Sequence, residues 1–189
     1  RLGEAIEVVR KLWSGKPVKH DGKFFGFPEI QMLPAPDRPG GPPIWCGARK
    51  GPALRRAGRL ADGWLSYAVT PDQYRAALQT ISAAAEEAER DLSHFATGHL
   101  LFIRLAKDYQ SALQYVTEKL SARYTMDFSA PAKRYCALGT AQEVAESIRQ
   151  FHAVGMRHLV IDFIAERSDQ IEQIDRFGAE VMPLLADLT

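Results

Sequence analysis

The sequence predicts an α/β protein in which parallel strands alternate with helices. Four short apolar runs, at residues 44–47, 62–67, 99–106 and 157–164, are separated by amphipathic helical stretches. This alternation is typical of a parallel sheet joined by right-handed crossovers. Four such strands make either an open sheet or half of an eight-stranded barrel, and 189 residues with 46% hydrophobic content suit one domain with a sizeable core.

Composition narrows the class of partner. A net charge of +1, from 24 basic and 23 acidic residues, gives no reason to expect nucleic acid or an anionic membrane as a partner. Cys46 and Cys136 lie far apart without a metal-ligand spacing, so we expect no metal site and a reducing, cytoplasmic location. No apolar run approaches the roughly 20 residues of a membrane span.

The chain opens with an amphipathic helix and a hairpin. The helix over residues 1–13 has no cap before it, which predicts that the chain starts inside a helix of a longer protein. Residues 18–20 and 23–25 flank Asp21-Gly22, a pair that favours a two-residue hairpin turn. Residues 28–43 contain six prolines and are expected to form an extended connector.

The later helices are predicted from their caps and apolar stripes. A helix over residues 52–60 follows the first apolar run, with Gly58 allowing close packing. Others are expected at 71–92, with Thr70 and Gln73 as a capping box, at 109–123 after Asp108, at 141–154 with Thr140 and Glu143 as a capping box, and from Ser168 or Asp169 onward, with Pro183 bending or ending the last one. Residues 124–138 lack periodicity and are predicted to be a long loop.

The junction after the first apolar run has the features of an anion site. Gly47, Ala48, Arg49 and Lys50 lie between a predicted strand end and a predicted helix start. Backbone N–H groups, the positive end of the helix dipole and two cations would meet there. The plainer interpretation is a turn at the strand end with a solvated arginine.

Five segments carry a resemblance to a known family. They are EAIEVVRKLWSG at 4–15, PPIWCGA at 42–48, AGRLADGWL at 57–65, LGTAQEVA at 138–145 and AVGMRHLV at 153–160. In this order and spacing they closely resemble the luciferase-like monooxygenase family. The resemblance implies a (β/α)8 TIM barrel that binds reduced FMN or a deazaflavin at the carboxyl ends of its strands.

By that resemblance the four strands correspond to the fifth through eighth of the barrel. Residues 1–189 would then be a single partial barrel domain whose amino-terminal half is absent. Because the family's catalytic residues lie in the early strands, none is assigned in this chain, and the fragment alone is expected to be inactive.

The resemblance also suggests two groups of site residues. Gly47, Ala48 and Arg49 stand where relatives often have Gly-Gly-Ser, a loop that holds the flavin phosphate, and Lys50 joins this cofactor-binding group. Alanine fits the second position only if no positive φ is needed there. The second group, in the predicted long loop where relatives shape the substrate entrance, is Tyr124, Lys133, Arg134 and Tyr135; a plain surface loop is the alternative.

The function expected from the resemblance is that of a flavin-dependent monooxygenase acting on an unknown small organic substrate. A deazaflavin-dependent hydride-transfer oxidoreductase is the alternative, and a non-catalytic binding or structural module is the alternative from another class. An FMN enzyme would need a flavin reductase as partner, and the full-length protein is expected to be a homo-oligomer. Ser/His/Asp order, a Walker loop and Gly-x-Gly-x-x-Gly are all missing from the sequence.

Overall fold

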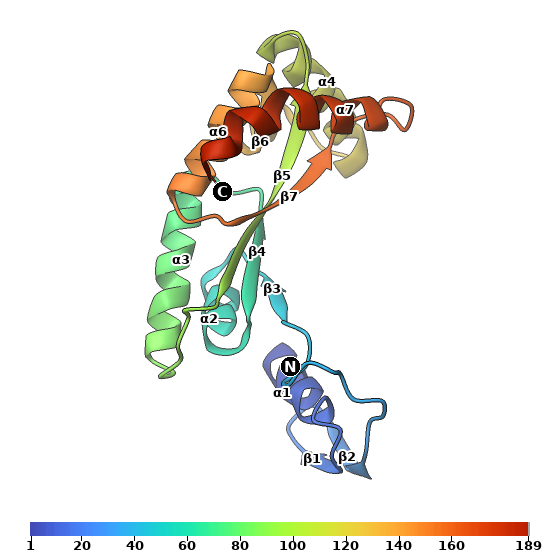
Figure 1. Ribbon diagram of the computed structural model, residues 1–189, viewed down its shortest axis with the longest axis vertical. Coiled ribbons are helices and arrows are strands. Elements are labelled where there is room, and N and C mark those ends of the chain that lie inside the picture. The colour runs from blue at the N-terminus through green and yellow to red at the C-terminus, as the bar shows by residue number, and fades with distance from the viewer. Residues whose placement is uncertain (189) are drawn as a thin grey trace.

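The computed structural model describes residues 1–188 and shows a parallel sheet flanked by helices, with a separate antiparallel hairpin near the N-terminus (Figure 1). The first helix and the hairpin lie at one end of the long axis, and α4 and α7 lie at the other. In chain order the elements are α1 (Leu2–Leu12), β1 (Val18–Asp21), β2 (Gly26–Ile30), β3 (Trp45–Gly47), α2 (Gly51–Leu60), β4 (Gly63–Tyr67), α3 (Pro71–Glu86), β5 (Ala96–Leu105), α4 (Tyr109–Tyr124), α5 (Ser129–Tyr135), β6 (Cys136–Gly139), α6 (Ala141–Ala153), β7 (His158–Phe163), α7 (Gln170–Arg176), η1 (Phe177–Val181) and η2 (Met182–Leu188).

The sheet contains the four predicted strands and one more. β4 pairs with β3 and β5, and β5 also pairs with β6 and β7, all in parallel. β5 pairs with β4 through Ala96–Leu100, with β6 through Phe102–Leu105, and with β7 through Gly98–Ile103. The range paired with β7 overlaps both of the others, and a strand has only two edges. β4 and β6 therefore pair with one edge of β5, and β7 pairs with the other. The predicted strands are therefore contiguous in the order β3-β4-β5-β7.

The prediction of a loop over residues 124–138 is wrong. This segment forms α5 and β6, which are seven and four residues long. Such short elements complete too few turns to show a periodic pattern in the sequence. α5 is fixed by Phe128 and Ala132, which are buried against Leu120 of α4 in a second, smaller core.

The hairpin turn also differs from the prediction. Asp21 belongs to β1 and pairs with Gly26, so the loop contains residues 22–25 rather than two residues. The N–H groups of Phe24 and Phe25 donate to the carboxylate of Glu4 on α1, which holds the longer loop. A Cβ on Gly22 would lie 2.1 Å from Glu4 Oε1, so a larger residue there would displace the carboxylate that holds the loop.

Three element boundaries differ from the predicted ones. α3 ends at Glu86 instead of residue 92, since the chain turns through Glu89 at φ 51° and β5 already begins at Ala96. The strand β2 extends into the predicted proline-rich connector. After α7 the last helix continues as a π turn and a 3-10 segment around Pro183, whose missing N–H prevents a regular α-helix.

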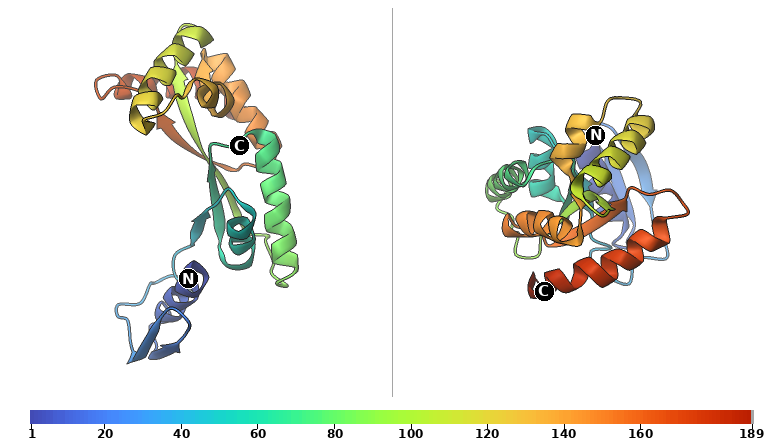
Figure 2. Two further views of the ribbon diagram at one scale, coloured as in Figure 1. Left: turned by 180° about the vertical axis from the view of Figure 1, so that it is seen from behind. Right: turned by 90° about the horizontal axis from the view of Figure 1, so that it is seen from above.

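The two faces of the sheet have different coverings. The main core packs α2, α3 and α6 against one face, and Figure 2 confirms that α3 runs along the outside of the molecule. Gly58 of α2 meets α3 so closely that a Cβ would lie 2.2 Å from the Ile81 carbonyl oxygen. This confirms the predicted close packing at Gly58. On the opposite face, α4 and α5 cover only the part near the carboxyl end of β5, through Phe102.

Candidate functional site

The Gly47–Lys50 loop connects the carboxyl end of β3 to the start of α2. The Ala48 side chain is buried in the core, and its carbonyl oxygen accepts a 2.9 Å hydrogen bond from the Trp64 indole N–H. No residue of the loop has a positive φ, so the alanine at position 48 causes no backbone strain. The hydrogen bond from Trp64 thus anchors the loop to the core, while Arg49 and Lys50 remain exposed.

The donor groups of this loop suit a phosphate. Lys50 is the N-cap of α2 and supplies no side-chain capping hydrogen bond. Within residues 1–188, neither Arg49 nor Lys50 forms an ion pair with a carboxylate. The helix start offers the N–H of Gly51, since Pro52 has no N–H and the N–H groups of Ala53 and Leu54 donate to the Lys50 carbonyl oxygen. Together with two cations that form no ion pair within residues 1–188, this N–H makes a favourable setting for an oxyanion.

Tyr67 is a residue of this region that the sequence analysis did not identify. It ends β4, is 49% exposed, and its ring centroid lies 5.4 Å from the Arg49 guanidinium carbon. This separation allows a cation–π contact that orients Arg49 over the strand end. The sequence signal for Tyr67 was its place as an aromatic residue at the end of one predicted strand, 62–67, next to the predicted strand that ends at Gly47.

The four predicted entrance residues lie on helices, not in a loop. Tyr124 ends α4 and stacks on Phe128 with centroids 5.2 Å apart. Lys133 and Arg134 are exposed on α5, and Arg134 lies 5.4 Å from the ring of Tyr135. They lie on the α4–α5 unit near the carboxyl side of the sheet, and within residues 1–188 no ring or cation–π contact joins them to the Gly47–Lys50 loop.

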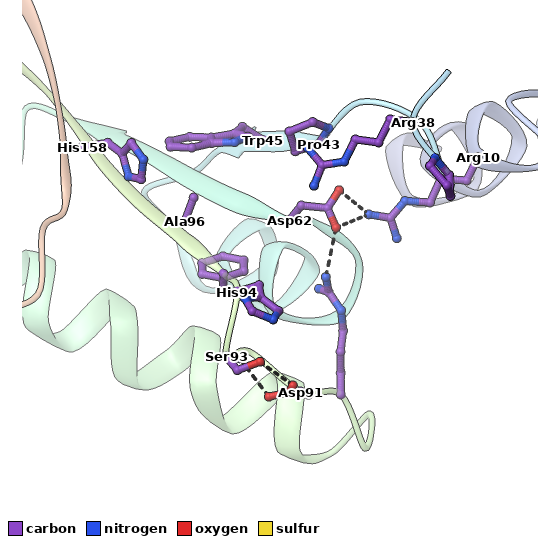
Figure 3. A pocket seen from close by; sticks show the side chains of 15 residues that line it. Arg10, Arg38, Pro43, Trp45, Asp62, Asp91, Ser93, His94, Ala96 and His158 are labelled. Carbon is purple, nitrogen blue, oxygen red and sulfur yellow. Dashed lines mark hydrogen bonds and ion pairs between the residues drawn. The ribbon is translucent and has the colours of Figure 1, made fainter. Parts of the chain in front are cut away.

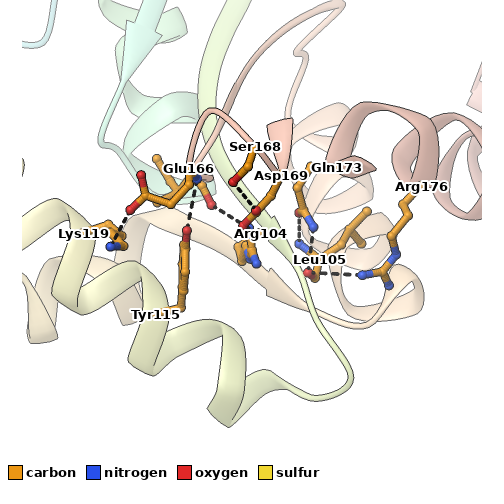
Figure 4. Close-up of polar contacts among 10 residues, drawn as sticks. Arg104, Leu105, Tyr115, Lys119, Glu166, Ser168, Asp169, Gln173 and Arg176 are labelled. Atoms are coloured by element: carbon orange, nitrogen blue, oxygen red, sulfur yellow. Dashed lines mark hydrogen bonds and ion pairs between the residues drawn. The ribbon is translucent and has the colours of Figure 1, made fainter. Parts of the chain in front are cut away.

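A polar network fixes the carboxyl ends of β5 and β7 (Figure 4). The Arg104 guanidinium lies 4.1 Å from the Tyr115 ring centroid and 3.7 Å from an Asp169 carboxylate oxygen. Tyr115 Oη accepts a hydrogen bond from the N–H of Glu166, whose carboxylate pairs with Lys119 at 2.6 Å. Arg104 therefore pairs with a nearby carboxylate and ties α4 to the loop after β7.

A cavity of about 710 Å³ lies at the amino ends of the strands (Figure 3). At its wall the Asp62 carboxylate accepts hydrogen bonds from Arg10 at 2.7 Å, from Arg90 at 3.4 Å and from the Ile44 N–H at 2.8 Å. Asp62 therefore caps a backbone N–H just before β3 and holds two guanidinium groups at the entrance of β4. Burial is the main cause that lowers the pKa of Arg90, and Asp62 opposes this effect.

A serine–histidine pair is buried between the sheet and the helices. Ser66 Oγ and His99 Nδ1 lie 2.7 Å apart, and both residues are fully buried. Burial lowers the pKa of His99 to about 4, so the imidazole is neutral at pH 7. The pair cannot reach a dissolved substrate, which makes its role structural. No local sequence signal predicts the pair, because strand register alone places residues 66 and 99 opposite each other.

Other chemistries find no support in the described part of the chain. Within residues 1–188, no group of three or more His, Cys, Asp or Glu side chains is placed to hold a metal ion. Cys46 and Cys136 are both free, and burial raises the pKa of Cys136 to about 12. None of the helices in the same residues has the length and apolar character needed to cross a membrane.

Comparison with known proteins identifies the class. The chain belongs to the luciferase-like monooxygenase family, whose model matches residues 1–158. One relative is an F420-dependent glucose-6-phosphate dehydrogenase from Gordonia bronchialis, which is 27% identical over an alignment that covers 100% of this chain and 61% of the relative. The chain therefore spans about three-fifths of the length of this curated relative.

Solved structures show the same fold. A coenzyme F420-dependent tetrahydromethanopterin reductase from Methanopyrus kandleri matches with a TM-score of 0.79 and 19% identity, over 96% of this chain and 62% of its own. A monooxygenase from Streptomyces bottropensis matches with a TM-score of 0.75 and 22% identity, over 95% and 59%. The prediction of a partial (β/α)8 barrel is confirmed, with β3, β4, β5 and β7 as consecutive barrel strands. The single-domain boundaries 1–189 stay a prediction.

Proposed function

We propose that this chain supplies the phosphate-binding side of the cofactor site in a deazaflavin-dependent oxidoreductase. The observation that supports this most is the Gly47–Lys50 loop, where two unpaired cations stand beside an uncapped helix start at the carboxyl end of β3. A relative aligned along the whole chain is F420-dependent by name. A deazaflavin cofactor supplies two-electron hydride transfer when it is bound.

The roles of this chain's own residues follow from their positions. Arg49, oriented by the Tyr67 ring, and Lys50 would neutralise phosphate charge, and the Gly51 N–H at the start of α2 would donate to a phosphate oxygen. Arg104 and its partners would keep the loop after β7 closed against α4, so that water has less access to the strand ends. The α4–α5 group of Tyr124, Lys133, Arg134 and Tyr135 would form part of the entrance for a small-molecule substrate.

The FMN-dependent monooxygenase is the second candidate, and the fold match to the Streptomyces bottropensis enzyme supports it. In that case the protein would receive reduced flavin from a flavin reductase and consume oxygen. Either enzyme would work as a homo-oligomer in its full-length form. A non-catalytic module is the third candidate, since the residues that perform the chemistry are not assigned in this chain.

Binding measurements separate the candidates. The chain is titrated with coenzyme F420 and with FMN, by cofactor fluorescence anisotropy. We expect tighter binding of F420, and about tenfold weaker binding in the Arg49→Gln/Lys50→Gln double variant, because two charge-assisted contacts are lost at an exposed site. Arg59→Gln, an exposed arginine at the far end of α2, is the matched control. Tighter binding of FMN would favour the monooxygenase, and binding of neither cofactor would favour the module.

A further inference from the structure

The cavity at the amino ends of the strands contains more positive than negative charge. Arg10, Arg38 and Arg90 line it together with only two carboxylates, those of Asp62 and Asp91. The Asp91 carboxylate already accepts two hydrogen bonds from Ser93, one from its backbone N–H and one from its hydroxyl. Asp62 thus faces three guanidinium groups and forms ion pairs with only two of them, Arg10 and Arg90.

Arg38 is the unpaired member of this group. Its side chain is exposed and forms no ion pair within residues 1–188, and Figure 3 shows its guanidinium pointing into the cavity near Asp62. Arg90 is held in place from the other side by a 2.9 Å hydrogen bond to the Gly58 carbonyl oxygen. An oxyanion between Arg38 and the Asp62 cluster would be attracted by positive charge that Asp62 does not neutralise.

A flat apolar wall stands opposite these charges. Trp45 lies across the sheet so closely that a Cβ on Gly63 or Gly98 would come within 2.7 Å of its ring. His158 meets the indole edge-on, with centroids 5.1 Å apart. The Trp45 ring therefore has a fixed orientation in a cavity of about 710 Å³, a volume that suits a small organic ligand.

We infer that this cavity binds a small molecule in which a phosphate or carboxylate group is attached to a flat ring. The anionic group would lie between Arg38 and the Arg10 and Arg90 guanidinium groups, and the ring would pack on Trp45. This site lies at the opposite ends of the strands from the Gly47–Lys50 loop. It does not depend on the proposed cofactor site, and it would act as a second ligand site on the same sheet.

The test is a titration of the 189-residue chain with phenyl phosphate, benzoate and inorganic phosphate, followed by tryptophan fluorescence and calorimetry. We expect saturable binding of at least one ring-bearing anion and weaker binding of inorganic phosphate. Comparing phenyl phosphate with benzoate shows which of the two anionic groups the cavity prefers. Arg38→Gln should weaken binding about tenfold without loss of thermal stability, because its side chain forms no ion pair within residues 1–188. Trp45→Phe identifies the fluorescence signal as that of the cavity.

Arg59→Gln is the matched control, because it removes an exposed arginine of α2 that does not line the cavity. Binding at the amino-end cavity should stay within twofold of the unchanged chain in this variant. Absence of saturable binding, or unchanged affinity in Arg38→Gln, or equal weakening by Arg38→Gln and Arg59→Gln, would overturn the inference. The Arg49→Gln/Lys50→Gln variant changes the Gly47–Lys50 loop and Arg38→Gln changes the amino-end cavity, so the two proposals can fail separately.

Discussion

Alternate residues of β4 point to opposite faces of the sheet, and the two faces have different surroundings. Trp64 and Ser66 face the helices and are fully buried, whereas Tyr67 on the other face is 49% exposed. β7 repeats the contrast, since Val160 is 41% exposed while Ile161 packs against the main core. The helix-covered face therefore determines most of the stability of this chain, and the open face contributes little to it. Substitutions on the two faces test this difference.

Removing the largest buried side chain should have the largest effect. Trp64→Ala should lower the free energy of unfolding by about 4 kcal/mol, because it leaves a cavity and also removes the hydrogen bond to Ala48. Tyr67→Ala, three positions along the same strand, should cost less than about 1 kcal/mol. Urea denaturation of both variants measures the difference. Equal losses would contradict the assignment of stability to the covered face.

The buried histidine on the covered face predicts a pH dependence. His99 has its pKa lowered to about 4 in the folded state, so the unfolded chain binds more protons between about pH 6.5 and 4. Stability should therefore fall as the pH drops through this window, by about 3 kcal/mol in total. His99→Asn should flatten the slope in urea denaturation curves, while His158→Asn on the open face serves as the control. A slope that persists in His99→Asn would contradict the prediction.

The partner of that histidine should have a smaller effect. Ser66→Ala leaves His99 Nδ1 without its 2.7 Å neighbour, in addition to Nε2, which already has no partner in the described residues. We expect a loss of about 1–2 kcal/mol, the usual cost of a buried polar atom left unsatisfied. Thermal unfolding at pH 7 measures it. An unchanged melting temperature would show that the pair contributes nothing to the core.

The smallest effect on stability is expected on the open face. β3 pairs only with β4, and β7 only with β5, within residues 1–188, so both edges of the sheet can pair with another chain. Val160→Lys should change the free energy of unfolding by less than about 0.5 kcal/mol. It should nevertheless reduce self-association, measured by sedimentation over a range of concentrations. A chain that is monomeric at all concentrations would show that the open face is not adhesive.

The sequence predicted what depends on local signals. The capping boxes at Thr70 and Thr140, the strand before Gly47 and the alternation of strands with helices are all present. It could not predict α5 and β6, because short elements are specified by packing on α4 and β5 rather than by periodicity.

Side-chain contacts between neighbouring strands could not be predicted from the sequence either. The Ser66–His99 pair and the Tyr67–Arg49 contact both depend on the register of neighbouring strands, which no single segment encodes. Arg38 lies near the Asp62 cluster only in the folded chain, since the two positions are 24 residues apart in the sequence. The Gly47–Lys50 loop of the candidate site could therefore be predicted from the sequence, but Tyr67, which orients Arg49, could not.

The sharing of one β5 edge by β4 and β6 has a consequence for how this fold tolerates change. Because β7, and not β6, takes the next barrel position beside β5, the chain between residues 106 and 139 is an excursion from the barrel order. The backbone pairing of β5 with β7 therefore does not pass through this segment. The segment acts on the carboxyl ends of these strands through side chains, since Tyr115 and Lys119 of α4 hold Glu166 after β7.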